Sequence, residues 1–191
     1  MAEDAREVVR TIEKMKVLLR IVQSDHVPVD LAEVVQSAVV QFKWQSGRAG
    51  VSIDTSGLDE SCVVEGDDVQ IQLAVSNLLR NAMEAIAADG RETGRIAVTL
   101  ARGKRSATVV VGDDGPGWSG EERDATPLST TKPQGTGIGL YIVRTVVRNH
   151  GGKVSLRRSP LGGAEVRLRL PLDGGDGRRG RGRRKSARPA S

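Results

Sequence analysis

The sequence predicts an α+β fold, a two-layer α/β sandwich in which a mixed sheet is covered by helices on one face. Helix and strand periodicities alternate in the order α-α-β-β-α-β-β-α-β-β. Apolar residues make up 38% of the 191 residues and aromatic ones only 2%, which indicates one aliphatic core. We expect three parts: an N-terminal amphipathic helix within residues 1–27, the sandwich over 28–172, and a tail over 173–191.

The first predicted helix covers residues 4–24. Its apolar residues recur every four and three positions, as in a coiled-coil seam: Val8, Ile12, Met15, Leu19 and Val22. Such a helix either pairs with another helix, in a helical hairpin or a homodimer, or lies on its own domain. The sequence leaves both arrangements open.

Capping residues and turns delimit the other elements. Pro28 ends the first helix, and Asp30 is expected to cap the second. The expected helices cover about 31–46, 68–88 and Thr136–Asn149. The expected strands are Val51–Asp54 and Cys62–Glu65 around the turn TSGLDES, Ile96–Arg102, Ser106–Val111, Lys153–Arg158 and Ala164–Leu170.

The net charge of +5 belongs to the tail, because residues 173–191 hold seven Arg and Lys against two Asp. This Gly/Arg-rich composition predicts disorder. The tail could contact nucleic acid, a membrane surface or an acidic partner, or it could have no specific partner at all. The absence of a long apolar run and of a signal-peptide pattern predicts a cytoplasmic protein. The single cysteine, Cys62, excludes an internal disulfide and is expected to be a small buried residue.

A polar stripe lies on the helix expected over 68–88. Asn77, Asn81 and Glu84 stand at i, i+4 and i+7, and so share one side of the helix. Amide and carboxylate oxygens suit Mg²⁺, which keeps waters and takes few protein ligands. Taken alone, the stripe is better explained by an ordinary exposed polar face.

A glycine-rich turn, Asp113-Asp114-Gly115-Pro116-Gly117, follows the strand that ends at Val111. A carboxylate at a strand end can accept a hydrogen bond from an exocyclic amine, and the glycines let a ring approach the backbone. A plain Asp-Gly turn is the alternative.

Three alternating glycines, Gly135, Gly137 and Gly139, precede or open the next helix. Free N–H groups and the helix dipole favour phosphate there. Lys132, just upstream, is a point charge within reach of a terminal phosphate. The segment is not a Walker loop, because no GK[ST] follows the glycines.

Taken together, NLLRNAMEA, DDGPG and STTKPQGTGIGL resemble the N box, the G1 box and the lid with G2 box of sensor histidine kinases. Their ATP-binding catalytic domain belongs to the superfamily that includes gyrase, Hsp90, MutL and the anti-sigma serine kinases. The resemblance covers about residues 28–172. It implies ATP and Mg²⁺ as cofactors.

The resemblance also implies a role for each matching residue. Asn81 is expected to ligate Mg²⁺, Asp113 to bind the adenine amine, and Asn77 and Lys132 to act near the transferred phosphate. The further positions expected to contact nucleotide are Gly115, Gly117, Thr131, Gly135, Thr136, Gly137, Gly139 and Leu140. The lid, Trp118–Gln134, is expected to close over nucleotide.

Two departures from the superfamily pattern define the expected subclass. Hydrolases and serine kinases carry a Glu where Asn77 stands, as a general base, and an amide cannot take a proton. A histidine acceptor is already a nucleophile and needs less help from the ATP-binding domain. The chain holds only His26 and His150. His26 is not followed by an acidic residue, and His150 ends a helix, where a dipole or capping role is expected, so neither is expected to be the acceptor.

The sequence thus predicts a Mg-ATP-binding kinase domain that phosphorylates a histidine of a dimerisation domain or a partner kinase chain, with a response regulator downstream. One alternative is an ATP-binding regulatory module without kinase chemistry. The other is a serine kinase of the anti-sigma type.

Overall fold

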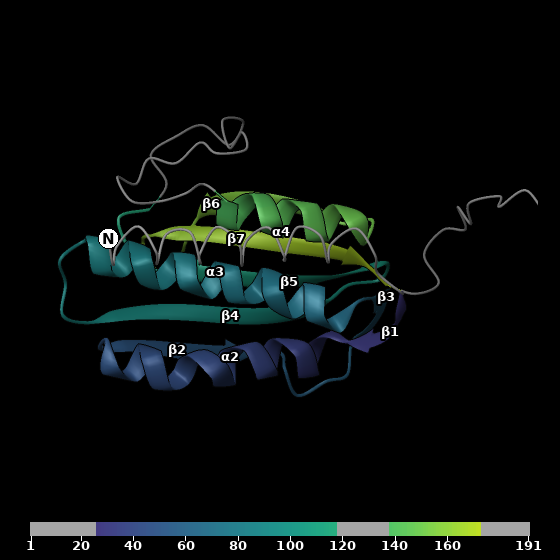
Figure 1. Ribbon diagram of the computed structural model, residues 1–191, viewed down its shortest axis with the longest axis horizontal. Helices are drawn as coiled ribbons and strands as arrows, with labels where there is room; N and C mark the ends of the chain where they lie inside the picture. Colours follow the sequence, from purple (N-terminus) through teal and green to yellow (C-terminus); the bar gives the residue numbers. More distant parts are fainter. Residues whose placement is uncertain (1–25, 118–137, 173–191) are drawn as a thin grey trace, which may run out of the picture.

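The computed structural model describes residues 26–117 and 138–172, which form two layers (Figure 1). Three helices lie on one face of a five-stranded sheet with the order β2-β4-β5-β7-β6, and β1 and β3 form a second, two-stranded sheet. The elements are β1 (Val27–Asp30), α2 (Leu31–Arg48), β2 (Val51–Ser56), β3 (Val63–Gly66), α3 (Asp68–Ala88), β4 (Gly94–Arg102), β5 (Ser106–Asp113), α4 (Ile138–Asn149), β6 (Lys153–Arg158) and β7 (Ala164–Pro171).

This architecture confirms the predicted α+β sandwich with a mixed sheet. The predicted helix over 4–24 and the tail over 173–191 lie outside the described residues. No helix of the described ranges is long and apolar enough to span a membrane.

Both long helices begin at aspartate caps. Asp30 accepts a hydrogen bond from the Ala32 N–H, and Asp67 accepts one from the Gln70 N–H, each at 3.0 Å. Asp30 also accepts from the Cys62 N–H at 3.0 Å. The same carboxylate therefore starts α2 and joins it to the residue that precedes β3.

The pairing of the first three strands was not foreseen. β1 was not predicted as a strand, and it pairs with β3 in antiparallel register. β2 pairs in parallel with β4, so the two strands on either side of TSGLDES belong to different sheets. Pro28 is tolerated because β1 is a short strand of a two-stranded sheet.

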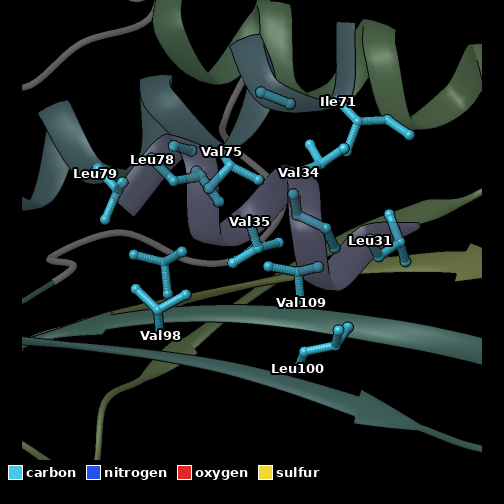
Figure 2. Close-up of a cluster of buried hydrophobic side chains, with 14 of the residues drawn as sticks. Leu31, Val34, Val35, Ile71, Val75, Leu78, Leu79, Val98, Leu100 and Val109 are labelled. Atoms are coloured by element: carbon cyan, nitrogen blue, oxygen red, sulfur yellow. The ribbon is translucent and has the colours of Figure 1, made fainter. Parts of the chain in front are cut away.

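The core lies between the helices and the large sheet, and Figure 2 shows side chains of α2 and α3 facing those of β4 and β5. Among the labelled residues, at most 2% of the surface is exposed in Leu31, Val35, Leu78, Leu79, Val98 and Val109. Burying each of these side chains is worth roughly 1.5–3 kcal/mol. Cys62 is buried as expected, and burial raises the pKa of its thiol.

Alternation along the strands gives the large sheet two different faces. Ile96, Val98 and Leu100 of β4 are buried against the helices, whereas the residues between them face away. Asp113 pairs with Ile96 in the register of β4 and β5. Its carboxylate therefore belongs to the face that the helices cover.

Candidate nucleotide-binding site

The polar stripe of α3 faces the first turn of α4. Asn77 is 9% exposed, and its Nδ2 donates a hydrogen bond to the Leu73 carbonyl at 2.8 Å. A Cβ added at Gly139 would lie 3.1 Å from Oδ1 of Asn81 and 3.5 Å from Oδ1 of Asn77. Glycine thus lets α4 begin directly against both amides. The burial of Asn77 rules out a plain exposed polar face, although Glu84 itself is exposed.

Backbone N–H groups fix the Asp113 carboxylate, which is 5% exposed. Its Oδ1 accepts hydrogen bonds from the N–H groups of Gly115 at 3.0 Å and Ala164 at 3.1 Å. Its main-chain carbonyl accepts a third hydrogen bond from the Gly163 N–H at 3.1 Å. The orientation of this carboxylate is therefore set by its own turn together with the β6–β7 loop.

Gly163 is a site residue that sequence reasoning missed. A Cβ at this position would lie 2.1 Å from Oδ1 of Asp113 and 2.6 Å from the Gly115 nitrogen. Only glycine lets the β6–β7 loop close on the turn this tightly. Gly117, at φ +82°, also faces the Gly163 carbonyl, which a Cβ would meet at 3.4 Å. The doublet Gly162-Gly163 was an available signal, since a simple hairpin loop does not need both glycines.

The second carboxylate of the turn, Asp114, connects it to the end of α3. The Arg91 guanidinium lies 3.3 Å from Asp114 Oδ1 and 2.8 Å from Asp89 Oδ2. The Arg95 N–H donates to Asp114 Oδ1 at 2.9 Å. Burial raises the pKa of Asp114, but the Arg95 hydrogen bond and the Arg91 guanidinium outweigh it, so the pKa stays below its usual value. The turn is thereby held against the start of β4 and the residues after α3.

Gly115 closes the gap between the turn and α3. A Cβ there would lie 3.3 Å from the carbonyl carbon of Ala85 and 3.1 Å from Oδ1 of Asp113. Leu140, in the first turn of α4, packs against the core. The other expected contacts lie outside the described residues, as does the lid Trp118–Gln134; they are Thr131, Lys132, Gly135, Thr136 and Gly137.

His150 has a structural role at the far end of the two helices. The ring is 3% exposed, its Nδ1 lies 2.8 Å from the Val146 carbonyl, and the Asp67 N–H donates to its Nε2 at 3.0 Å. These partners assign the proton to Nδ1 of a neutral ring. Burial lowers the pKa of His150, and the neighbouring His26, stacked at 4.9 Å between ring centroids, lowers it further. The expected capping role is confirmed, whereas a dipole role would need a cationic ring.

The described residues offer few ligands of their own for a metal ion. No group of three His, Cys, Asp or Glu in these ranges could hold a metal ion. A cation beside Asn81 would therefore take an amide oxygen and the phosphate oxygens of the ligand, as Mg²⁺ commonly does. Gly139 lies against Asn81 at this position, whereas Gly115 and Gly163 lie against the Asp113 carboxylate.

Residues 66–174 match the family described as "Histidine kinase-, DNA gyrase B-, and HSP90-like ATPase", and the chain belongs to this family. Its fold is that of the ATP-binding catalytic domain of histidine kinases. The catalytic domain of the histidine kinase ThkA superposes with a TM-score of 0.69 at 28% identity, covering 77% of this chain and 95% of that one. The mycobacterial sensor histidine kinase MprB gives a TM-score of 0.65 at 27% identity, covering 77% and 97%.

Curated relatives are sensor histidine kinases. The sensor histidine kinase ZraS of Klebsiella oxytoca is 30% identical over 177 residues, which are 91% of this chain and 37% of ZraS. The sensor-type histidine kinase PrrB of Mycobacterium leprae is 32% identical over 151 residues, 76% of this chain and 32% of PrrB. The chain spans about a third of the length of these relatives.

Proposed function

We propose that the chain binds Mg-ATP and donates the γ-phosphate to a histidine of a helical dimerisation domain, as the phosphate-donor part of a cytoplasmic two-component kinase. The observation that carries this proposal is the meeting of Asn77 and Asn81 with Gly139 at the start of α4. Two motifs about 60 residues apart in the sequence thereby form one wall of a site. The acceptor histidine lies in another segment or another chain, and a response regulator receives the phosphate from it.

Asp113 is the proposed adenine ligand. Its Oδ1 is engaged by the N–H groups of Gly115 and Ala164, so the carboxylate is oriented before nucleotide arrives. A carboxylate oxygen accepts a hydrogen bond from an exocyclic amine, which distinguishes adenine from a base with a carbonyl at that position. Gly115 and Gly117 flank the base because side chains there would crowd it.

Asn81 and the start of α4 are the proposed phosphate end of the site. Asn81 offers an amide oxygen to Mg²⁺, and Gly139 in the first turn of α4, the positive end of the helix dipole, lies beside it. Bound Mg²⁺ supplies charge neutralisation of the phosphates. Lys132 and the residues Thr131, Gly135, Thr136 and Gly137 are proposed to complete this end, with Leu140 supporting it from the core.

Asn77 favours transfer to histidine over hydrolysis or transfer to serine. Its amide nitrogen already donates to the Leu73 carbonyl, and an amide cannot act as a general base. Imidazole attacks a phosphoryl group without losing a proton first. His150 is not the proposed acceptor, because both of its ring nitrogens are occupied within the core.

A reconstitution assay tests the proposal. The chain is incubated with γ-labelled Mg-ATP and a separately expressed histidine-bearing helical hairpin, with a His→Gln hairpin as control. Acid-labile label on the histidine hairpin alone supports kinase activity. Mg-ATP binding without label on any histidine-bearing hairpin would instead favour the ATP-binding module that transmits a signal without chemistry. Label on serine would favour the anti-sigma type.

A further inference from the structure

The face of the large sheet that points away from the helices is basic along β6 and β7. Val154, Leu156 and Leu168 belong to the helix-facing series of these strands. The outward partners across the two strands are Lys153 with Arg169, Ser155 with Arg167, and Arg157 with Glu165. We call Lys153, Arg157, Arg167 and Arg169 the basic sheet face.

The four cations of the basic sheet face are accessible and largely uncompensated. Lys153, Arg157 and Arg169 are exposed, and the Arg167 side chain is 40% exposed. The one carboxylate at an outward position of β6 or β7 is Glu165, which is 7% exposed and lies 2.6 Å from Arg167 Nε. Three cations therefore remain without a countercharge on these strands.

Hydroxyl groups are interspersed among the cations. Ser155 pairs with Arg167, Thr108 of β5 pairs with Arg169, and Ser106 accepts a hydrogen bond from Arg169 Nε at 2.9 Å. Neighbouring strands lie about 4.8 Å apart, and alternate residues along a strand about 6.7 Å apart. The cations and hydroxyls thus form a patch across three strands, and both are groups that commonly contact phosphate.

The flanking sequences do not offer a countercharge. Residues 173–191 hold seven Arg and Lys against two Asp, and residues 1–25 hold five basic and five acidic residues. Residues 118–137 hold three acidic and two basic residues, a net charge of −1. The sequence therefore contains no strongly acidic segment that would cover the basic sheet face.

The composition of the face indicates which kind of molecule would bind it. The fully buried core of a protein interface is enriched in apolar and aromatic side chains, and an amphipathic membrane-binding surface buries apolar side chains in the lipid. The apolar side chains at outward positions of β5, β6 and β7 are Val110 and Pro171, both half-buried. Nucleic-acid interfaces are polar and positively charged, and arginine suits phosphate in particular. No aromatic residue stands at these outward positions to stack on unpaired bases.

We propose that the basic sheet face binds double-stranded nucleic acid through its phosphates, independently of sequence. Asp113 and Asn81 lie on the helix-covered side of the sheet, so a duplex on the basic sheet face leaves the nucleotide site accessible. The chain would then hold a duplex and ATP at the same time.

A fluorescent 20-base-pair DNA duplex is titrated with the full chain at several salt concentrations to test this. The double variant R157Q/R169Q removes two cations of the basic sheet face. Its matched control, K43Q/R148Q, removes two exposed cations from α2 and α4, on the helical layer. Each lost phosphate contact lowers the slope of log K against log salt by about 0.9, so the slope should fall by about two in R157Q/R169Q. Affinity at 0.1 M salt should fall roughly 10- to 60-fold, while the control keeps the wild-type slope.

Equal losses in both variants would assign binding to net charge or to the basic tail and overturn the proposal. So would tighter binding of poly-L-glutamate or of anionic lipid vesicles than of the duplex at the same salt. ATP affinity and the unfolding temperature verify that each variant is folded. If R157Q/R169Q does not fold, K153Q/R157Q takes its place, because it changes only exposed side chains of the edge strand β6.

Discussion

Replacing Gly163 with alanine is expected to weaken ATP binding through the Asp113 carboxylate. The added Cβ would lie 2.1 Å from Asp113 Oδ1, and an ordinary contact there is at least 3.4 Å, so the groups must separate by about 1.3 Å. Such a displacement breaks the hydrogen bond proposed between this carboxylate and adenine, and losing a hydrogen bond to a charged group lowers affinity by about 10- to 150-fold. Overpacking of this kind also lowers the free energy of unfolding by roughly 1–3 kcal/mol.

Gly162 provides the matched control for this substitution. Its φ is +109°, and a Cβ there meets nothing within 4 Å. Gly162→Ala should therefore lose roughly 1–3 kcal/mol of stability through backbone strain while leaving Asp113 in place. Calorimetric titration with Mg-ATP, together with thermal unfolding, separates the two effects. If Gly163→Ala binds ATP as tightly as Gly162→Ala, the role assigned to Gly163 is wrong.

Four further outcomes are expected. Asp113→Asn keeps one oxygen for the N–H groups of Gly115 and Ala164 but replaces the other oxygen with a donor. ATP affinity should therefore fall about 10- to 150-fold, with little change in unfolding temperature. Unchanged ATP affinity would contradict the assignment of Asp113 to adenine. The unfolding temperature should fall as the pH drops below about 6.5, because His150 takes up a proton in the unfolded chain but, with its lowered pKa, not in the folded one. Thermal melts from pH 7.5 to 5.5 should show a weaker pH dependence in His150→Gln. An equal dependence in both proteins would contradict this role of His150. Gly47→Ala in α2, where a Cβ meets nothing, should raise the free energy of urea unfolding by about 0.5–1 kcal/mol. Deletion of residues 173–191 should leave ATP affinity unchanged, and a large loss would show that the tail contributes to the site.

Local signals predicted the helices well because their ends are decided within a few residues. Asp30 and Asp67 cap α2 and α3 through N–H groups two and three positions away. The identity of β1 could not be predicted in this way. It has four residues including Pro28, and becomes a strand through pairing with β3, more than 30 residues later.

The site shows the same division between local and long-range information. The Asn stripe and the Asp-Gly turn are readable as motifs, and the structure brings Asn77, Asn81 and Gly139 together. The support of Asp113 by Ala164 spans 51 residues and depends on the β5–β7 register. The position of His150 at the end of α4 predicted its capping role. Its second partner, the Asp67 N–H, could not be predicted in this way because it lies 83 residues away in the sequence.

The close approaches at Gly117 and Gly139 affect how freely the length of the chain between them can vary. Gly117 is set against the Gly163 carbonyl, and Gly139 against Asn81, so both ends of the connection over 118–137 are anchored. The entropy of closing a loop grows only with the logarithm of its length, and doubling the length costs about 0.6 kcal/mol. Insertions and deletions between the two anchors should therefore be almost neutral for folding. Changes in the length of this connection should also leave the spacing between Asp113 and Asn81, the proposed adenine and Mg²⁺ ligands, unchanged.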